Sequence, residues 1–186
     1  MSRVLKEYLL LLGFSGSVIA LDQWTKWVVR ENLPFQGTWL PESLSWLAPY
    51  ARVVHWYNSG AAFGMFQNGN LIFTILAIIV ILAILYYFPR VEPDDWTLKI
   101  AMGLQLSGAA GNLIDRLLMG KVTDFISIGR FPVFNVADSS ITIGVIVLLI
   151  GVWMREHWQR KQHSDNEPDR EGSLPTGREN SVVNTE

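Results

Sequence analysis

Residues 70–88 (NLIFTILAIIVILAILYYF) hold no charged side chain, and this run constrains the fold more than any other feature of the sequence. A helix needs roughly 20 mostly apolar residues to cross the hydrocarbon core of a bilayer. Only 17% of the chain is charged, whereas about 25% is usual for a soluble domain. The run therefore predicts a membrane-spanning helix, and the composition places the chain among integral membrane proteins.

Three further segments, at residues 8–27, 96–118 and 135–158, approach the same length and apolar character. Pro89 and Pro93 separate the run at 70–88 from the next segment, because proline interrupts a helix. The first segment has the composition of a secretory leader, but three more apolar segments follow it, so we interpret it as a permanent span. The sequence thus predicts an all-α membrane protein with four transmembrane helices and both termini on one side.

Orientation does not follow from charge, because lysines and arginines divide almost equally between the two predicted sides. Residues 161–186 are polar and contain Pro, Gly, Ser and Asn, so they are expected to form a disordered tail. The remaining residues, 1–160, are expected to form a single membrane domain.

The predicted loops at 31–69 and 119–134 are too apolar to be plain linkers. Three segments in them are rich in β-forming side chains and are expected to be strands: 52–57, 121–125 and 130–134, the last two joined through Gly129. A small β-sheet lying on the membrane surface is the expected result. The aromatic side chains suited to the lipid headgroup level are Trp39, Trp46, Tyr50 and Trp56.

Several chemistries have no support in the sequence. There are no cysteines, which excludes disulfides, thiolate metal sites and a cysteine nucleophile. The three histidines do not form a zinc-peptidase spacing such as HExxH. The net charge of -2 gives no basic surface for nucleic acid.

Charged side chains gather where the predicted spans end. Charges inside a spanning helix are costly and usually functional. In the four-span arrangement six such groups fall on one side of the membrane: Asp22, Lys26, Asp115, Arg116, Asp124 and Asp138. This convergence predicts a polar site near one membrane surface.

Spacing divides these groups into local pairs and isolated acids. Asp22 and Lys26 are four residues apart and are expected to form an ion pair on one helix face. Asp115 and Arg116 are expected to be a partnered pair that anchors the following loop. Asp124 and Asp138 have no obvious partner nearby in the chain. Gly108 and the small residues after it would allow another helix backbone to approach closely.

Two carboxylates that share a poorly solvated site hold one proton between them. Such a pair can activate water and protonate a scissile peptide, as aspartic peptidases do. Intramembrane carboxylates also occur in proton-coupled transporters, and polar residues can act as helix glue in noncatalytic assembly proteins. These alternatives stay open on the charges alone, although the clustering at one face favours a surface site over a conduit.

Five short segments occur in the order and at the intervals found in bacterial lipoprotein signal peptidases, also called signal peptidase II. They are DQWTK at 22–26, NSGAAFG at 58–64, GAAGNLIDR at 108–116, VTDFI at 122–126 and FNVADSSI at 134–141. One such segment would be weak evidence, but five in order are specific. Residues 22–141 thereby resemble this family.

The resemblance implies an aspartic endopeptidase that removes the signal peptide from diacylglyceryl-modified prolipoproteins, cutting just before the lipidated cysteine. It assigns the catalytic pair to Asp124 and Asp138, with no metal or organic cofactor. It further implies the bacterial inner membrane, cytoplasmic termini, and a site near the periplasmic face. The sheet would be extracytoplasmic, with a short surface helix over the site at 61–67, and globomycin would occupy the substrate groove.

Supporting residues also follow from the resemblance. Asn112 and Asn135 would orient the carboxylates, and Asp115 and Arg116 would tie the loop that carries Asp124. Asp22 and Lys26 would fix the end of the first span, and Lys26 would balance buried negative charge. The other supporting or substrate-binding positions are Asn58, Gly60, Gly108 and Ala137. The expected partners are prolipoproteins and membrane lipid, and the chain is expected to be a monomer, because one copy holds every group.

Overall fold

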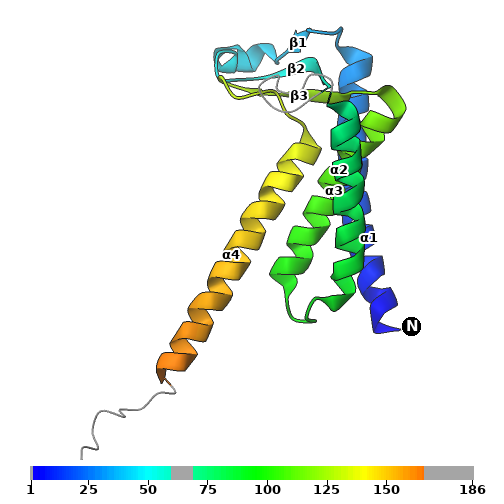
Figure 1. The fold of residues 1–186 in the computed structure, drawn as a ribbon. Helices are drawn as coiled ribbons and strands as arrows, with labels where there is room; N and C mark the ends of the chain where they lie inside the picture. The colour runs from blue at the N-terminus through cyan, green and yellow to red at the C-terminus, as the bar shows by residue number, and fades with distance from the viewer. Residues whose placement is uncertain (1, 60–68, 166–186) are drawn as a thin grey trace, which may run out of the picture. The chain divides into compact units, whose positions relative to one another are not determined.

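The structure is a computed structural model that describes residues 2–59 and 69–165. The chain divides into two compact units, 1–151 and 152–186. The predicted short helix at 61–67, Gly60 and most of the tail lie outside the described residues. The described elements are α1 (Arg3–Asn32), β1 (Thr38–Trp39), η1 (Glu42–Leu47), β2 (Ala51–Asn58), α2 (Asn70–Tyr87), η3 (Phe88–Arg90), α3 (Trp96–Met119), β3 (Val122–Ile128) and α4 (Val136–Asp165) (Figure 1).

Local sequence explains where the helices begin and end. The Ser2 hydroxyl accepts a hydrogen bond from Leu5 N at the start of α1, and Asp95 accepts one from Leu98 N at the start of α3. Helix α1 ends before Pro34, whose ring disfavours helical backbone in Leu33. Gly120 adopts a φ of 70° after α3, a conformation that glycine tolerates at helix ends. The observed helices therefore cover the predicted spans and extend beyond most of them.

Within residues 2–59 and 69–165, three helices are long and apolar enough to cross a membrane: α1, α2 continued through η3, and α4. Helix α3, which the sequence also predicts to be a span, is less apolar because of its small and polar residues. Ten of its residues are nevertheless buried, more than in any other helix whose buried residues are described. It is the central element of the first unit and contacts both α1 and α2.

The core of the first unit forms between α1, α2 and α3. Leu11, Ile84, Phe88, Met102 and Leu106 belong to one buried apolar cluster. Two hydrogen bonds also join these helices, because hydroxyl groups donate to backbone carbonyls of a neighbouring helix. The hydroxyls of Ser15 and Tyr8 donate to Gly103 O at 3.0 Å and to Leu85 O at 2.8 Å.

The sheet has the strand order β1-β2-β3, and both pairings are antiparallel. Trp56 pairs with Asp124 and Asn58 pairs with Val122, so these four residues share one stretch of the ladder. Strand β3 contacts both α1 and α3, which places the sheet at the ends of these helices (Figure 1). The predicted strands at 52–57 and 121–125 are confirmed by β2 and β3.

The prediction of a strand at 130–134 is wrong. Only an isolated bridge between Ile126 and Phe134 forms there. Pro132 lacks the N–H that a ladder needs, and Gly129 turns the chain with a φ of 52°. The third strand is instead the two-residue β1, which sequence pattern did not reveal.

Glycines bring α4 close to α3 within the first unit. A Cβ atom added at Gly108 would lie 2.4 Å from Ala137 O and 2.5 Å from an Ile141 side-chain atom. An added Cβ at Gly144 would lie 3.0 Å from Ala101 O. Real Cβ atoms do not approach backbone as closely as 2.4 Å, so glycine is required at position 108, and the contact at Gly144 is tight. The first turn of α4 is thereby held against α3.

The second unit contains the last turns of α4, from Val152 onward. Its described side chains are exposed, including Trp153 and Trp158. Glu156 and Arg160 form an exposed i, i+4 ion pair at 3.7 Å, and Trp153 stacks on His157. Such an exposed pair contributes little to stability.

Candidate active site

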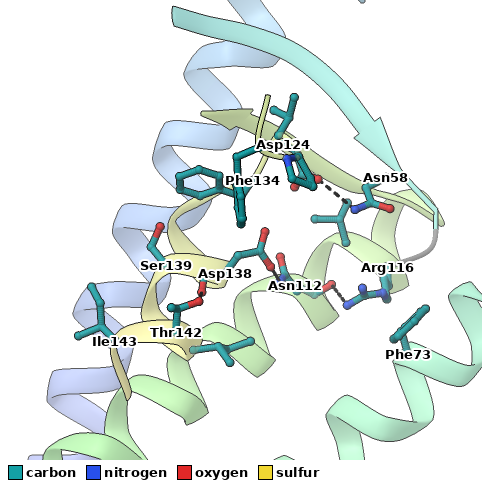
Figure 2. Close-up of a pocket in the computed structure, with 15 residues that line it drawn as sticks. Asn58, Phe73, Asn112, Arg116, Asp124, Phe134, Asp138, Ser139, Thr142 and Ile143 are labelled. Carbon is teal, nitrogen blue, oxygen red and sulfur yellow. Dashed lines mark hydrogen bonds between the residues drawn. The ribbon is translucent and has the colours of Figure 1, made fainter. Parts of the chain in front are cut away.

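Asp124 and Asp138 line the same cleft, which has a volume of about 610 Å³. Side chains from three other elements also contribute to its wall (Figure 2). Asn58 comes from the end of β2, Phe73 from α2, and Asn112 and Arg116 from α3. Most of the lining is apolar, so the two acids face a mainly hydrocarbon cleft. The sequence prediction that these separate segments converge is therefore supported by the geometry.

Asp124 lies in the middle of β3 and is 1% exposed. Its Oδ1 accepts a hydrogen bond of 2.7 Å from Asn135 Nδ2. Its Oδ2 accepts one of 3.2 Å from Asn58 Nδ2 (Figure 2). Both carboxyl oxygens therefore receive side-chain amide donors. The antiparallel register brings Asn58 and Asp124 together, because their strands are neighbours in the sheet.

Asp138 lies in the first turn of α4. Its Oδ1 accepts a hydrogen bond of 2.8 Å from Asn112 Nδ2 of α3 (Figure 2). Its Oδ2 accepts one of 3.2 Å from the backbone N–H of Asn135. An acidic residue in the first turn is also favoured by the helix dipole.

Asn135 connects the two acids. Its Nδ2 reaches Asp124, while its Oδ1 accepts a 2.9 Å hydrogen bond from the backbone N–H of Asp138. Together with the bond from Asn135 N to Asp138 Oδ2, this forms a reciprocal capping arrangement at the start of α4. One fully buried residue thus fixes Asp138 on its helix and binds Asp124 on the strand.

Burial and, to a smaller extent, the neighbouring negative charge of Asp138 raise the pKa of Asp124 to about 7, from an ordinary value of 3.8. The hydrogen bonds from Asn58 and Asn135 and the positive charge of Lys26 act in the opposite direction but are weaker. Asp124 is consequently able to hold a proton near neutral pH. This is the electrostatic condition in which two acids can take different roles.

A buried ion cluster lies behind the two acids. Lys26 Nζ is 2.8 Å from Asp22 Oδ2 and 3.4 Å from Asp115 Oδ2, and all three side chains are almost fully buried. The predicted Asp22–Lys26 pair is thus confirmed. Arg30 adds a second cation, with Nη1 at 3.8 Å from Asp115 Oδ1. Two anions are therefore matched by two cations.

Two further contacts join this cluster to the elements that carry Asp124 and Asp138. Asp22 Oδ1 accepts a 2.9 Å hydrogen bond from Ala137 N in the first turn of α4. Asp115 Oδ2 accepts one of the same length from Thr123 N, directly before Asp124. The expectation that Asp115 ties the loop carrying Asp124 is therefore supported, and Ala137 lies at the junction through its backbone.

Arg116 does not pair with Asp115, and the expectation of a partnered pair is wrong. Neighbouring residues on a helix point about 100° apart, so Asp115 faces the cluster while Arg116 faces the cleft. Its Nη1 donates to Asn112 O at 3.5 Å, and its guanidinium lies 5.5 Å from the Phe73 ring. Within the described part of the chain it makes no ion pair, which leaves a cation at the cleft wall.

Some contributors could not be singled out from the sequence. Gln23 Nε2 lies within 3.2 Å of an oxygen of Asp22, Gly111 and Asp115. Gly111 leaves room for Asp22, whose Oδ2 would lie 2.7 Å from an added Cβ. A glutamine next to an aspartate is not a sequence pattern that predicts such contacts. The capping pattern of Asn135 and Asp138, in contrast, is legible as Asn-x-x-Asp directly before an apolar run.

No group of three or more His, Cys, Asp or Glu side chains in residues 2–59 and 69–165 is arranged to hold a metal ion. Of the site residues predicted from the sequence, the structure brings the following together: Asp22, Lys26, Asn58, Gly108, Asn112, Asp115, Arg116, Asp124, Asn135, Ala137 and Asp138. Gly60 lies outside the described residues.

Known proteins resemble the chain over most of its length. The sequence model of the family described as signal peptidase (SPase) II matches residues 14–154. A lipoprotein signal peptidase of Anoxybacillus flavithermus is 40% identical over 152 residues, which cover 80% of this chain and 87% of the relative. One of Geobacillus thermodenitrificans is 42% identical over 140 residues, covering 73% and 84% respectively.

Solved structures agree with these relatives. A bacterial membrane enzyme determined by the in meso method at 2.3 Å resolution has a TM-score of 0.67 and 30% identity, with 86% of this chain and 93% of that chain covered. A second, at 1.9 Å resolution, has a TM-score of 0.64 and 32% identity over 76% and 91%.

Apolar helices, a small sheet and this kinship define a bacterial membrane peptidase of the aspartic class. More closely, the chain belongs to the signal peptidase II family.

Proposed function

We propose that the chain removes signal peptides from prolipoproteins that carry diacylglycerol on a cysteine, cutting just before that cysteine, with Asp124 and Asp138 as the catalytic pair. The observation that carries this proposal is that Asn135 binds both acids at one cleft. Relatives named lipoprotein signal peptidase support the substrate class.

The two acids have different roles in the proposed reaction. Asp124, whose pKa is about 7, holds the shared proton. Asp138 is the ionised partner and takes a proton from a water molecule, which attacks the scissile carbonyl carbon. Asp124 donates its proton to the carbonyl oxygen as the tetrahedral intermediate forms. The intermediate then collapses: the C–N bond breaks, the proton on Asp138 passes to the leaving amine, and one hydroxyl proton of the intermediate returns to Asp124 as the carbonyl re-forms. Because the acids interact, their titration belongs to the pair.

The apolar lining of the cleft suits a lipid-modified substrate. Phe73, Phe131 and Ile141 contribute side chains to it, and about 610 Å³ lies within the usual range of ligand cavities. Acyl chains on the cysteine would remain among these side chains and surrounding lipid. The peptide would pass over the acids, where water enters from the membrane surface.

Other residues of the site position the peptide or the helices. Arg116 and Asn58, which both line the cleft, are proposed to bind peptide carbonyl groups. Gly60 is proposed to permit close approach of the substrate backbone. Gly108 and Ala137 permit the close contact of α3 with the first turn of α4.

We further propose a membrane domain of residues 1–160 with four spans and a cytoplasmic tail at 161–186. Helix α3 has 24 residues, which correspond to about 36 Å and exceed a hydrocarbon core of about 30 Å. Its contacts with α1 and α2 support a crossing beside them. The termini would be cytoplasmic in the inner membrane, with the site, the sheet and a short surface helix at 61–67 on the periplasmic side.

The proposed enzyme acts as a monomer and needs no cofactor. Every group in the reaction comes from one chain. Prolipoprotein and membrane lipid are its partners. Globomycin-type inhibitors are expected to bind in the cleft and block cleavage.

The test is cleavage of a diacylglyceryl-modified prolipoprotein by the purified protein in detergent, followed by mass spectrometry. Asp124→Asn and Asp138→Asn should each retain the fold and lose cleavage by at least about 1,000-fold, because each removes one acid–base step. Asp94→Asn is the matched control, since Asp94 is exposed between η3 and α3. Near-parental cleavage by either site variant would remove that residue from the catalytic pair. A parent that never cleaves would overturn the function.

A further inference from the structure

Lys26 is fully buried, and its ammonium group lies among three oxygen atoms. Its Nζ lies 2.8 Å from Asp22 Oδ2, 3.0 Å from Asn112 Oδ1 and 3.4 Å from Asp115 Oδ2. An ammonium group has three N–H donors and no acceptor. Lys26 therefore has one hydrogen bond and two ion-pair partners, and its side chain does not line the cleft. Lys26 is consequently not placed to exchange a proton with a substrate.

The amide of Asn112 lies between Lys26 and Asp138. Its Oδ1 accepts from Lys26, and its Nδ2 donates to Asp138 Oδ1 at 2.8 Å. The reverse orientation would turn the amide N–H groups toward the ammonium and the amide oxygen toward the carboxylate. The contact with Lys26 would then be repulsive, and so would the contact with Asp138 unless that acid were protonated. A group that only donates thus selects the orientation in which Asn112 donates to Asp138.

Asn135 contributes less to this selection. Its own orientation is fixed by the backbone N–H of Asp138, which donates to Asn135 Oδ1 at 2.9 Å. Its Nδ2 has three acceptors within reach, on Asp124, Asn112 and Thr123, but only two hydrogens to share among them. It can therefore stay bonded to Asp124 and Thr123 if the Asn112 amide turns over, whereas Lys26 has no such freedom.

We propose that Lys26 is a positioning residue for the peptidase reaction: its ammonium fixes the Asn112 amide so that Nδ2 donates to Asp138 and holds that carboxylate ionised to take a proton from water. This inference rests on the proposed function and adds a cause for the different roles of the two acids. The charged groups around Lys26 and the two acids, from every element packed there, are Asp22 and Arg30 on α1, Asp115 and Arg116 on α3, Asp124 on β3 and Asp138 on α4.

Lys26→Met tests the proposal, because methionine keeps the length and apolar stem but has no donor and no charge. In the cleavage assay kcat should fall about 10- to 100-fold, as small misplacements of reacting groups do, while KM changes little. The acidic limb of the pH profile should move to higher pH, because ionised Asp138 loses support. Lys99→Met is the matched control: Lys99 bonds Glu7 and Pro93 O, remote from the cleft, and its loss should leave the profile unchanged.

A double-mutant cycle distinguishes positioning from a general structural role. If Lys26 acts through Asn112, then Lys26→Met in an Asn112→Ala background should cost no further activity. Independent roles would multiply the two losses. Because Lys26→Met leaves Asp22 buried without its cation, folding is secured by Asp22→Asn/Lys26→Met, which removes both charges and keeps the Asp22 Oδ1 acceptor for Ala137 N.

The outcomes separate the two levels of the argument. An active parent whose folded Lys26 variants keep kcat and the pH profile would overturn the role of Lys26 and leave the peptidase function standing. Losses that multiply in the cycle would also overturn it. An inactive parent would overturn the proposed function, and the role of Lys26 with it.

Discussion

Asn135 shows how a single residue can couple helix geometry to acid–base chemistry. It caps α4 through Asp138 N and binds Asp124 through the opposite end of the same amide. A displacement of the start of α4 would therefore also displace the hydrogen-bond donor of Asp124 on β3. The two carboxyl groups are held by short asparagine side chains and by one backbone N–H, and not by long flexible side chains, which favours a fixed mutual geometry.

The raised pKa of Asp124 predicts the pH dependence of cleavage. The reaction needs one protonated and one ionised acid, so activity should decline as pH rises through the pKa of about 7. The measurement is kcat/KM between pH 5 and pH 9 in detergent, with the single-turnover rate as a check that chemistry is followed. A profile that stays flat up to pH 9 would contradict protonated Asp124 as the acid.

The same group predicts a pH-dependent stability. Folded Asp124 binds its proton more tightly than the unfolded chain, whose pKa is near 3.8. Stability from this group is thus fully present below about pH 4 and is lost as pH rises to about 7, by up to about 4 kcal/mol. Asp124→Asn should therefore match the parent at pH 4 and have a higher unfolding temperature at pH 8. Equal differences at both values would contradict the assignment.

At the residue scale, the sequence predicted which side chains converge but not all of their contacts. The ends of the helices and the Asp22–Lys26 ion pair could be predicted from the sequence, because both follow from regular helix geometry. Arg116 was paired with the wrong partner, since adjacency in the chain says little about direction on a helix. Gln23 carried no signal at all, because its contacts arise only when α1 meets α3.

At the scale of elements, the contact between α3 and α4 depends on Gly108. Gly108→Ala would place a Cβ 2.4 Å from Ala137 O and force α4 outward. We expect a loss of about 1–3 kcal/mol in stability from overpacking and at least about 100-fold lower activity, because Asp138 moves with the helix. Thermal unfolding and cleavage measure the two effects.

Gly13→Ala is the control for this substitution, because an added Cβ there meets nothing within 4 Å. It should keep activity at the parental level. If Gly108→Ala behaves like Gly13→Ala, the close contact does not position Asp138.

The sheet shows which secondary-structure elements could be predicted from the sequence and which could not. Strands β2 and β3 were predictable because they are eight and seven residues long, whereas β1 has two residues and leaves no pattern. The segment at 130–134 has β-forming composition, but Pro132 cannot complete a ladder. Helices were easier, since long apolar runs and capping residues act locally.

For the whole molecule, the four-span arrangement makes a prediction about which side each loop occupies. The chain has no cysteine, so single cysteines can be labelled without background. Ser45→Cys and Arg130→Cys should react with an impermeant maleimide from outside the cell, because they lie in the loops that carry the sheet. Glu92→Cys and Glu156→Cys should react only in inverted vesicles.

Each of these four positions is exposed in the structure. Labelling of Arg130→Cys and Glu92→Cys from the same side would mean that α3 does not cross. Cleavage activity of each variant serves as the control for folding.

The polar character of α3 has a consequence for how the protein is made. Asp115 finds its counter-ions, Lys26 and Arg30, on α1, which leaves the ribosome before α3 does. In the proposed four-span arrangement, the cations on α1 that neutralise Asp115 are already in place when α3 enters the bilayer. The order of synthesis is therefore part of the assembly: a nascent α3 without α1 would bring an uncompensated charge into hydrocarbon, and would stall at the insertion step.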